Sequence, residues 1–179
     1  MYAMKIAIVG YSGSGKSTLA RFLSEELRAP VLYLDTVHWL PGWKERPREE
    51  TRAIVQKFLD ENESWIIDGS YGKVHYQRRM DEADKIIFLN FNRFTCLRRA
   101  FKRRKEYKGK NRFSMTEGCE ERISWQFFWW LIWTGRTKKR REKFKALQRA
   151  YPDKITVIKN QRQLDAWKSS VENHLRETT

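Results

Sequence analysis

Eight residues near the start of the chain have the types and spacing of a phosphate-binding loop. Gly10 to Ser17 reads Gly-Tyr-Ser-Gly-Ser-Gly-Lys-Ser, which matches the pattern GxxxxGK[ST]. Its glycines let backbone N–H groups converge on phosphate oxygens at the start of a helix. Lys16 is expected to reach the β- and γ-phosphates of a nucleoside triphosphate, and the Ser17 hydroxyl to bind Mg²⁺. The expected nucleotide contacts are Gly10, Ser12, Gly13, Ser14, Gly15, Lys16, Ser17 and Thr18. An ordinary glycine turn is the less favoured alternative, because a strand-like run precedes the loop and helical spacing follows it.

Two aspartates follow strand-like runs and have the acid–base and metal chemistry that such a loop needs. Asp68 comes directly after Trp65-Ile66-Ile67, where phosphate-loop proteins place a carboxylate for Mg²⁺. Asp35 follows the run Val31–Leu34, and there it can orient or deprotonate an acceptor hydroxyl. Each also fits a local role, as a loop cap or an Asx turn. We expect Ser17 and Asp68 at the metal, and Lys16 and Asp35 at the reacting groups.

The basic residues are concentrated in one third of the chain. The 37 Lys and Arg exceed the 22 Asp and Glu by 15, and the segment 93–149 holds 19 basic and 5 acidic residues. Such a block indicates a polyanionic partner: nucleotide phosphates, nucleic acid or an anionic membrane surface. We interpret residues of about 104–118 as a lid over the phosphates. Arg103, Arg112 and Arg136 are expected to stabilise the transferring phosphoryl group, and the other cations to form a solvated face.

A segment of nine residues, Trp125 to Trp133, is apolar almost all the way around a helix. Such a helix is buried on several sides or covered by a partner. Three interpretations stay open: core packing, a homodimer interface, or insertion at a membrane surface next to Lys138–Arg141.

Short apolar runs alternate with helical patterns along the chain. Strands are expected at 4–9, 31–34, 64–68, 85–89 and 155–158, and helices at 16–27, 47–62, 93–108, 117–150 with a possible break at Gly135, and 161–176. The stretch 36–46 is expected to be irregular. This alternation predicts a three-layer α/β/α fold with a five-stranded parallel sheet, in one domain of residues 1–179 that includes the lid. Ligands of such sheets gather at the carboxyl ends of the strands.

Other classes of protein are disfavoured by composition. The two cysteines form no CxxC pair, and the three histidines are too scattered for a metal cage. No apolar stretch approaches the roughly 20 residues of a membrane span. Residues 1–9 do not resemble a signal peptide, so a cytoplasmic location is expected.

Several stretches together resemble the topology-modulation (FlaR-related) proteins of the adenylate-kinase-like P-loop group. They are GYSGSGKST, Asp35 with His-Trp-Leu-Pro-Gly-Trp43, Trp65-Ile-Ile-Asp-Gly69 and Gly-Cys119-Glu-Glu-Arg122. The resemblance implies a nucleoside and nucleotide kinase fold, a flexible lid after the fourth strand, and a nucleotide base held near Lys159 and Asn160. Adenylate kinases differ in having a proline where this chain has Ser12, and Asp-Gly-Phe-Pro-Arg where it has Asp68-Gly-Ser-Tyr-Gly. AMP is therefore not assigned as the acceptor.

The function expected from these residues is transfer of a phosphoryl group from ATP, or another nucleoside triphosphate, with Mg²⁺. The acceptor is a small hydroxyl compound, which includes nucleosides and nucleotides. The alternative is a nucleotide-regulated nucleic-acid-binding protein that modulates DNA topology, in which the basic block grips the phosphate backbone. A third interpretation is a catalytically idle nucleotide-binding module that acts through its aromatic segment.

Overall fold

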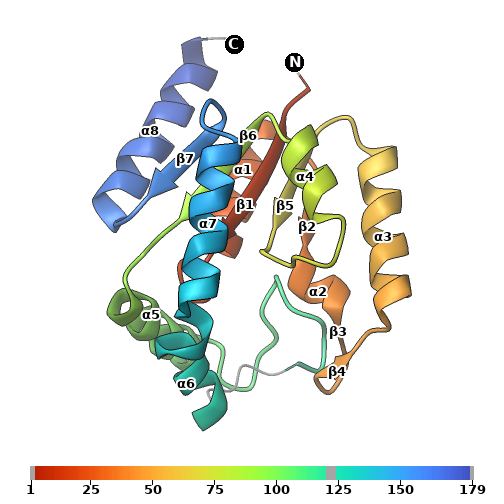
Figure 1. Ribbon diagram of the computed structural model, residues 1–179, viewed down its shortest axis with the longest axis vertical. Coiled ribbons are helices and arrows are strands. Elements are labelled where there is room, and N and C mark those ends of the chain that lie inside the picture. The colour runs from red at the N-terminus through yellow and green to blue at the C-terminus, as the bar shows by residue number, and fades with distance from the viewer. Residues whose placement is uncertain (1–2, 120–123, 178–179) are drawn as a thin grey trace.

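The computed structural model describes residues 3–119 and 124–177, and its centre is a parallel sheet (Figure 1). The strands are β1 (Lys5–Gly10), β2 (Val31–Tyr33), β5 (Trp65–Asp68), β6 (Lys85–Leu89) and β7 (Ile155–Ile158). They pair in the order β2-β5-β1-β6-β7, and every pair is parallel. The central strands are buried on both faces, which explains their continuous apolar runs. The predicted five-stranded sheet is confirmed.

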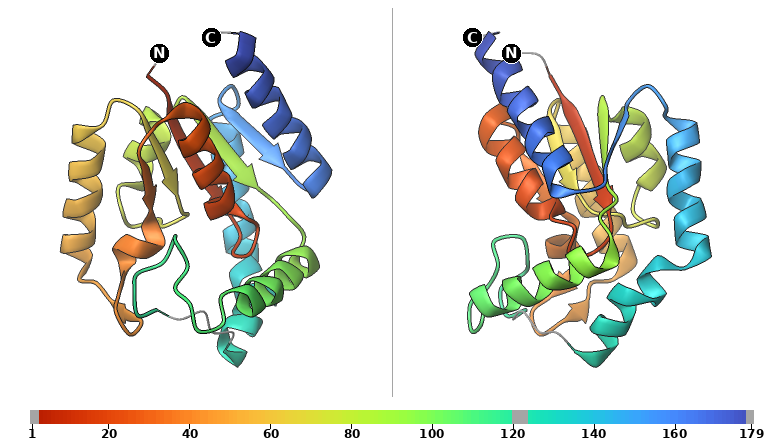
Figure 2. Two further views of the ribbon diagram at one scale, coloured as in Figure 1. Left: turned by 180° about the vertical axis from the view of Figure 1, so that it is seen from behind. Right: turned by 90° about the vertical axis from the view of Figure 1, so that its left-hand side faces the viewer.

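Helices cover both faces of this sheet. Helices α1 (Lys16–Leu27) and α8 (Gln161–Glu177) lie on one face, and α4 (Tyr76–Glu82) and α7 (Lys138–Ala150) on the other (Figure 2). Helix α3 (Arg48–Glu61) runs beside β2 at the sheet edge (Figure 1). The three-layer α/β/α prediction is therefore confirmed. In the part of the chain that the structure describes, no helix is long and apolar enough to cross a membrane.

Two regions differ from the sequence prediction. The stretch expected to be irregular contains α2 (Leu34–His38) and a small hairpin of β3 (Trp39–Leu40) and β4 (Lys44–Glu45). Helix α4 was not expected at all, because it is short and buries Arg79 beside Met80 in place of an apolar stripe. Both helices are too short for the helical period to stand out in the sequence.

The aromatic segment forms α6 (Trp125–Ile132), and a 3₁₀ turn η1 (Thr134–Arg136) separates it from α7. The predicted break at Gly135 is confirmed. A Cβ at this position would lie 2.5 Å from the Trp130 carbonyl oxygen, so the turn requires glycine. The predicted start at residue 117 is wrong, because 117–119 are not helical. Residues 120–123 of that predicted helix lie outside the described residues.

The segment after α5 (Arg93–Glu106) folds back over the ends of β2 and α2. The Thr116 hydroxyl donates to the carbonyl oxygens of Trp39, at 2.5 Å, and Thr36, at 3.1 Å. The Cys119 thiol donates to the Leu40 carbonyl at 3.2 Å. The Phe113 ring meets the Tyr33 ring edge-on with centroids 5.6 Å apart. The segment expected to act as a lid is thus docked against the β2 side of the sheet.

One buried arginine holds the loop after β5. Arg79 has no exposed surface, and its guanidinium donates to the carbonyl oxygens of Gly69, Tyr71 and Val74 at 3.1, 2.6 and 3.0 Å. Burial lowers the pKa of Arg79 to about 10, so the group stays charged near neutral pH. These three bonds fix the path of residues 69–74, which pass directly beside the phosphate-binding loop.

Replacing Arg79 with methionine is expected to destabilise the protein by about 3 kcal/mol, because three carbonyl groups lose their donors, and those of Gly69 and Val74 are buried. Urea unfolding followed by far-UV circular dichroism measures the loss. Arg78→Met is the matched control in the same helix. Arg78 is partly exposed and pairs with Asp60 and Glu82 on the surface, so about 1 kcal/mol or less is expected. Equal losses for the two variants would contradict the assigned role of Arg79.

Candidate functional site

The phosphate-binding loop wraps around the N-terminus of α1, directly after β1. Its glycines are needed for two reasons. Gly10 and Gly13 have φ values of 148° and 73°. A Cβ on either would lie 2.5 Å from a carbonyl oxygen, of Leu89 and Cys96 respectively. From the neighbouring loop, the Ser70 hydroxyl accepts from the Gly10 N–H at 3.0 Å. Neighbouring segments therefore hold the loop closely at both Gly10 and Gly13.

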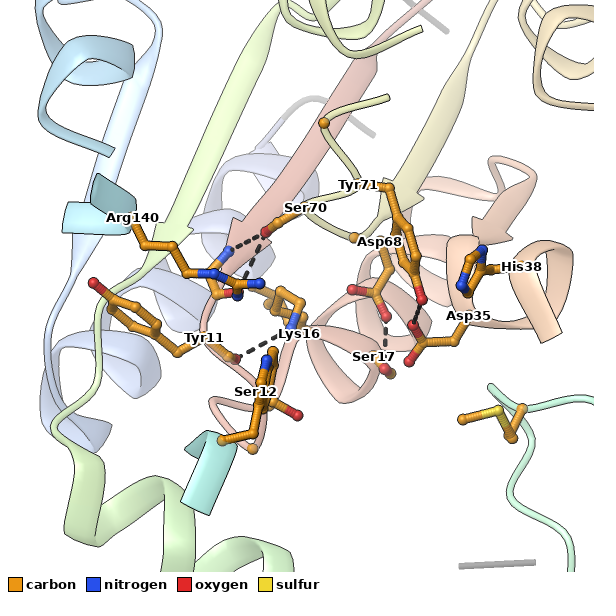
Figure 3. Close-up of a pocket in the computed structure, with 18 of the residues that line it drawn as sticks. Tyr11, Ser12, Lys16, Ser17, Asp35, His38, Asp68, Ser70, Tyr71 and Arg140 are labelled. Atoms are coloured by element: carbon orange, nitrogen blue, oxygen red, sulfur yellow. Dashed lines mark hydrogen bonds between the residues drawn. The ribbon is translucent and has the colours of Figure 1, made fainter. Parts of the chain in front are cut away.

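The side chains expected at the phosphates and the metal lie together at the end of β1 and β5 (Figure 3). The Lys16 ammonium group donates to the Tyr11 carbonyl at 3.2 Å, within the loop itself. The Ser17 hydroxyl donates to one carboxylate oxygen of Asp68 at 2.6 Å. The other oxygen of Asp68 is buried and has no hydrogen-bond partner in the described part of the chain. Burial raises the pKa of the Asp68 carboxyl, and the nearby Lys16 lowers it.

Asp35 lies opposite this group, in the first turn of α2. The Tyr71 hydroxyl donates to one of its carboxylate oxygens at 2.8 Å, and the Arg112 guanidinium lies 3.6 Å from the other. Burial, and then the Asp35 charge, raise the pKa of Tyr71, so this hydroxyl stays protonated as a donor. The rings of His38 and Tyr71 pack with centroids 4.9 Å apart, and His38 also contacts Trp39. Asp35 is thus held in place from two directions.

A single large cleft joins the two groups. Its volume of about 2160 Å³ is roughly twice the upper end of the range for pockets that hold one small ligand, about 1,000 Å³. The cleft therefore has room for two ligands side by side. The predicted residues that line it are Gly10, Ser12, Gly13, Gly15, Lys16, Ser17, Thr18, Asp35, Asp68, Arg103 and Arg112.

Four predicted residues do not line this cleft. Ser14 belongs to the loop and is fully buried. The Arg136 guanidinium lies over the Tyr11 ring, 3.9 Å from its centroid, and donates to the Phe91 carbonyl at 2.8 Å. The Asn160 side chain accepts from the Gln163 N–H at 2.9 Å, and the Lys159 N–H donates to the Gln163 side chain at 2.8 Å. Asn160 thus has a local structural role as the cap at the start of α8, while the next residue, Gln161, lines the cleft.

The structure brings other cations to the cleft. Arg140 extends from α7 toward Ser70 and Lys16 (Figure 3), and Lys143 lies beside it on the same helix. Arg136 and Arg140 would share a face only in a continuous helix. The 3₁₀ turn and the extended Thr137 interrupt the helix between them, so Arg136 packs inward and Arg140 faces the cleft. Arg99 reaches the cleft from α5, where it donates to the Ser14 carbonyl at 2.5 Å and contacts Gln161.

Comparisons with known proteins agree with this fold. Three solved structures share the fold. TT1252 from Thermus thermophilus has 15% sequence identity and a TM-score of 0.56 over the whole of both chains. Shikimate kinase from Acinetobacter baumannii in complex with shikimate has 13% identity and a TM-score of 0.51 over 99% of this chain and 95% of that one, and deoxyadenosine kinase from M. mycoides with bound dATP has 17% identity and a TM-score of 0.51 over 94% of this chain and 99% of that one. No curated protein matches the sequence significantly. Residues 6–121, which include the phosphate-binding loop, Asp35 and Asp68, match the family described as AAA domain. Because this match covers more than half of the chain, the protein belongs to the AAA domain family.

Proposed function

We propose that this protein is a Mg²⁺-dependent kinase that transfers the γ-phosphoryl group of ATP, or of another nucleoside triphosphate, to a hydroxyl group of a small acceptor. The observation that carries the proposal is the placement of Asp35. It lies in the same cleft as Lys16 and Ser17, on the opposite wall, and its carboxylate is held by Tyr71 and Arg112. A protein that only binds nucleotide has no need of a fixed carboxylate at this point.

The donor nucleotide occupies the phosphate-binding loop in this proposal. The loop N–H groups and Lys16 bind its phosphates, as the helix N-terminus and the lysine charge favour. Arg99 and Gln161 contact each other at the cleft wall, and Arg99 also donates to the carbonyl of Ser14 in the phosphate-binding loop. We place the nucleoside part there, close to the predicted residues Lys159 and Asn160.

The residues around Ser17 fit a magnesium ion. The Ser17 hydroxyl and the unpartnered oxygen of Asp68 are hard oxygen ligands of the kind Mg²⁺ takes. Among the described residues no group of three or more His, Cys, Asp and Glu could hold a metal by itself. This agrees with an ion that takes its remaining ligands from nucleotide phosphates and water. When bound, the ion neutralises charge on the phosphate oxygens.

On the acceptor wall, the Asp35 carboxylate accepts a hydrogen bond from the attacking hydroxyl and takes its proton as the new oxygen–phosphorus bond forms. The bond between the γ-phosphorus and the bridging oxygen breaks in the same transfer, and the nucleoside diphosphate leaves. Tyr71 and Arg112 keep the carboxylate pointed at the cleft, and His38 and Trp39 provide an aromatic wall beside it. The charge on the transferring group is balanced by cations that line the cleft. They are Lys16, Arg103, Arg112, Arg140 and Lys143. Arg140 takes the role that the sequence predicted for Arg136.

The basic block favours this proposal over the nucleic-acid alternative. Eight of its 19 cations line the cleft: Arg99, Lys102, Arg103, Arg112, Lys139, Arg140, Lys143 and Arg149. A cleft focuses the field of such charges on a small anionic ligand bound beside the phosphate-binding loop. The resemblance to topology-modulation proteins stays a prediction.

Asp68→Asn tests the nucleotide site. Burial raises the pKa of Asp68 in the folded protein above its value in the unfolded chain. The folded wild type therefore loses stability as the pH rises from the unfolded pKa through the folded one, because Asp68 must then ionise while buried. Asparagine is therefore expected to stabilise the ligand-free protein by about 1 kcal/mol at neutral pH. The gain should vanish as the pH falls toward the ordinary value of aspartate, about 3.9. The same variant should bind ATP with Mg²⁺ about tenfold more weakly and ATP without Mg²⁺ unchanged.

Thermal unfolding across this pH range and calorimetric titration measure both effects. Asp153→Asn, in an exposed turn before β7, is the control and should change neither. A wild-type protein that binds ATP equally with and without Mg²⁺ would contradict the proposed metal site. A wild-type protein that binds no nucleoside triphosphate would contradict the proposed function.

A further inference from the structure

Helix α6 and the residue that caps its C-terminus carry a row of exposed tryptophans. Trp125, Trp129 and Trp133 follow one another at intervals of four residues, so they lie on one side of the helix, and they are 71%, 43% and 55% exposed. The opposite side is directed to the core, since Leu131 is buried and Phe127 packs against buried residues. The core-packing interpretation therefore accounts for the inner side only. We call Trp125, Trp129 and Trp133 the aromatic row.

The aromatic row is an ordered surface. Trp125 stacks on Phe128 at an interplanar angle of 7°, and the rings of Trp129 and Trp133 lie 4.7 Å apart. The Ser124 side chain caps the helix by accepting from the Phe127 N–H at 3.0 Å. Large exposed apolar patches on a protein surface indicate an interaction site. The row needs a partner that accepts indole rings.

A cationic rim adjoins the row at its C-terminal end. A second hollow on the surface is lined by Trp133 together with Arg93, Lys138 and Arg141. Helix α7 begins with four consecutive cations, 138–141, and has no acidic residue in its first turn. Cations are unfavourable there, because a helix N-terminus already carries partial positive charge. Within the described ranges, no carboxylate pairs with Lys138 or Arg141. This arrangement costs stability in the free protein and favours an anionic partner.

Two of the three available partners fit poorly. A second copy of the chain would bring the same aromatic row and the same cationic rim, so a two-fold contact would add positive charge at the rim and no negative charge to balance it. Nucleic-acid bases stack on open ring faces, but Trp125 is stacked on Phe128, and Trp129 contacts both Trp125 and Trp133. An anionic lipid surface fits both features, because indole rings favour the membrane interface and Lys and Arg attract acidic headgroups.

We propose that the aromatic row and the cations Arg93, Lys138 and Arg141 form a surface that binds an anionic membrane. The tryptophan rings insert at the level of the headgroups, and the three cations contact lipid phosphates. The surface lies at the start of α7, and further along the same helix Arg140 and Lys143 line the cleft. Binding there would place the cleft near the membrane, because Phe127 and Trp130 of α6 also line it. This inference does not depend on the proposed kinase activity.

Flotation with lipid vesicles tests the proposal. The full chain is expected to float with vesicles of phosphatidylglycerol and phosphatidylcholine in equal amounts, and at least tenfold more weakly with phosphatidylcholine alone. The triple variant Trp125→Gln, Trp129→Gln, Trp133→Gln should lose at least tenfold in affinity. Lys138→Gln with Arg141→Gln should weaken binding about fivefold for each charge removed. Lys44→Gln with Lys57→Gln, which removes two charges elsewhere, should bind as the wild type does.

Brominated lipids provide a second measurement on the unaltered protein, since they should quench tryptophan fluorescence if the row inserts. Far-UV circular dichroism checks that each variant is folded. If the triple tryptophan variant unfolds, the proposal is tested by the vesicle binding of the Lys138→Gln, Arg141→Gln variant and by the quenching of the wild-type protein. Failure of the wild type to bind the anionic vesicles, or tryptophan variants that bind them normally, would overturn the proposal. So would a tryptophan-dependent dimer in sedimentation velocity, or tryptophan-dependent binding of single-stranded DNA, in a protein that does not float.

Discussion

Lys16→Ala is expected to lower kcat/KM for phosphoryl transfer by a factor of about 10³. Lys16 is the cation built into the phosphate-binding loop, and its ammonium group donates to the Tyr11 carbonyl of the same loop at 3.2 Å. Its charge is therefore available to oxygens that become more negative as the phosphoryl group moves. Because those oxygens are already charged in the bound nucleotide, affinity for ATP should fall as well. Initial rates and calorimetric titration measure the two losses.

Lys57→Ala is the matched control for this experiment. Lys57 is an exposed lysine of α3, where it pairs with Glu61 at 3.8 Å on the surface. The variant removes the same charge and the same side chain, and rates and affinity should stay at wild-type values. An unchanged ATP affinity in Lys16→Ala would contradict the assignment of the loop as the nucleotide site.

Asp35→Asn is expected to lower kcat by a factor of about 10² to 10⁴, with little change in ATP affinity. Asparagine has nearly the shape of aspartate and still offers an oxygen to the Tyr71 hydroxyl, but it cannot accept the proton of an attacking hydroxyl. The loss should therefore appear in the transfer step and not in donor binding. Initial rates at saturating ATP, together with titration of the nucleotide, separate the two quantities.

Asp153→Asn, in an exposed turn before β7, is the control and should leave kcat unaltered. If Asp35→Asn transfers phosphoryl groups at the wild-type rate, Asp35 is not the general base. The kinase proposal would then need another group on the acceptor wall.

The sheet and the phosphate-binding loop could be predicted from the sequence because both are local. Each strand is a short apolar run that ends at a glycine or polar residue, and the loop is a fixed pattern between a strand and a helix. Asp35 and Asp68 follow from the same rule, since parallel strands end at one edge of the sheet. The structure does bring these two carboxylates into one cleft with Lys16.

The parts that escaped prediction depend on contacts between distant segments. Arg140 faces the cleft and Arg136 does not, because a single 3₁₀ turn changes the direction of the chain between them. Arg112 reaches Asp35 only because Thr116 and Cys119 tie their segment to the β3 region. No sequence pattern around Arg79 indicated that its guanidinium would donate hydrogen bonds to three loop carbonyls, because its partners are backbone atoms that any residue provides.

The central claim is that the cleft transfers a γ-phosphoryl group to an organic hydroxyl. ATP labelled in its γ-phosphate should be incubated with the protein, Mg²⁺ and a mixture of nucleosides, nucleotides and hydroxy acids, and the products separated by chromatography. The account predicts label on an organic acceptor, with transfer lost on chelation of Mg²⁺ and in Lys16→Ala. Label that stays in ATP, or appears only as inorganic phosphate whatever acceptor is present, would contradict it.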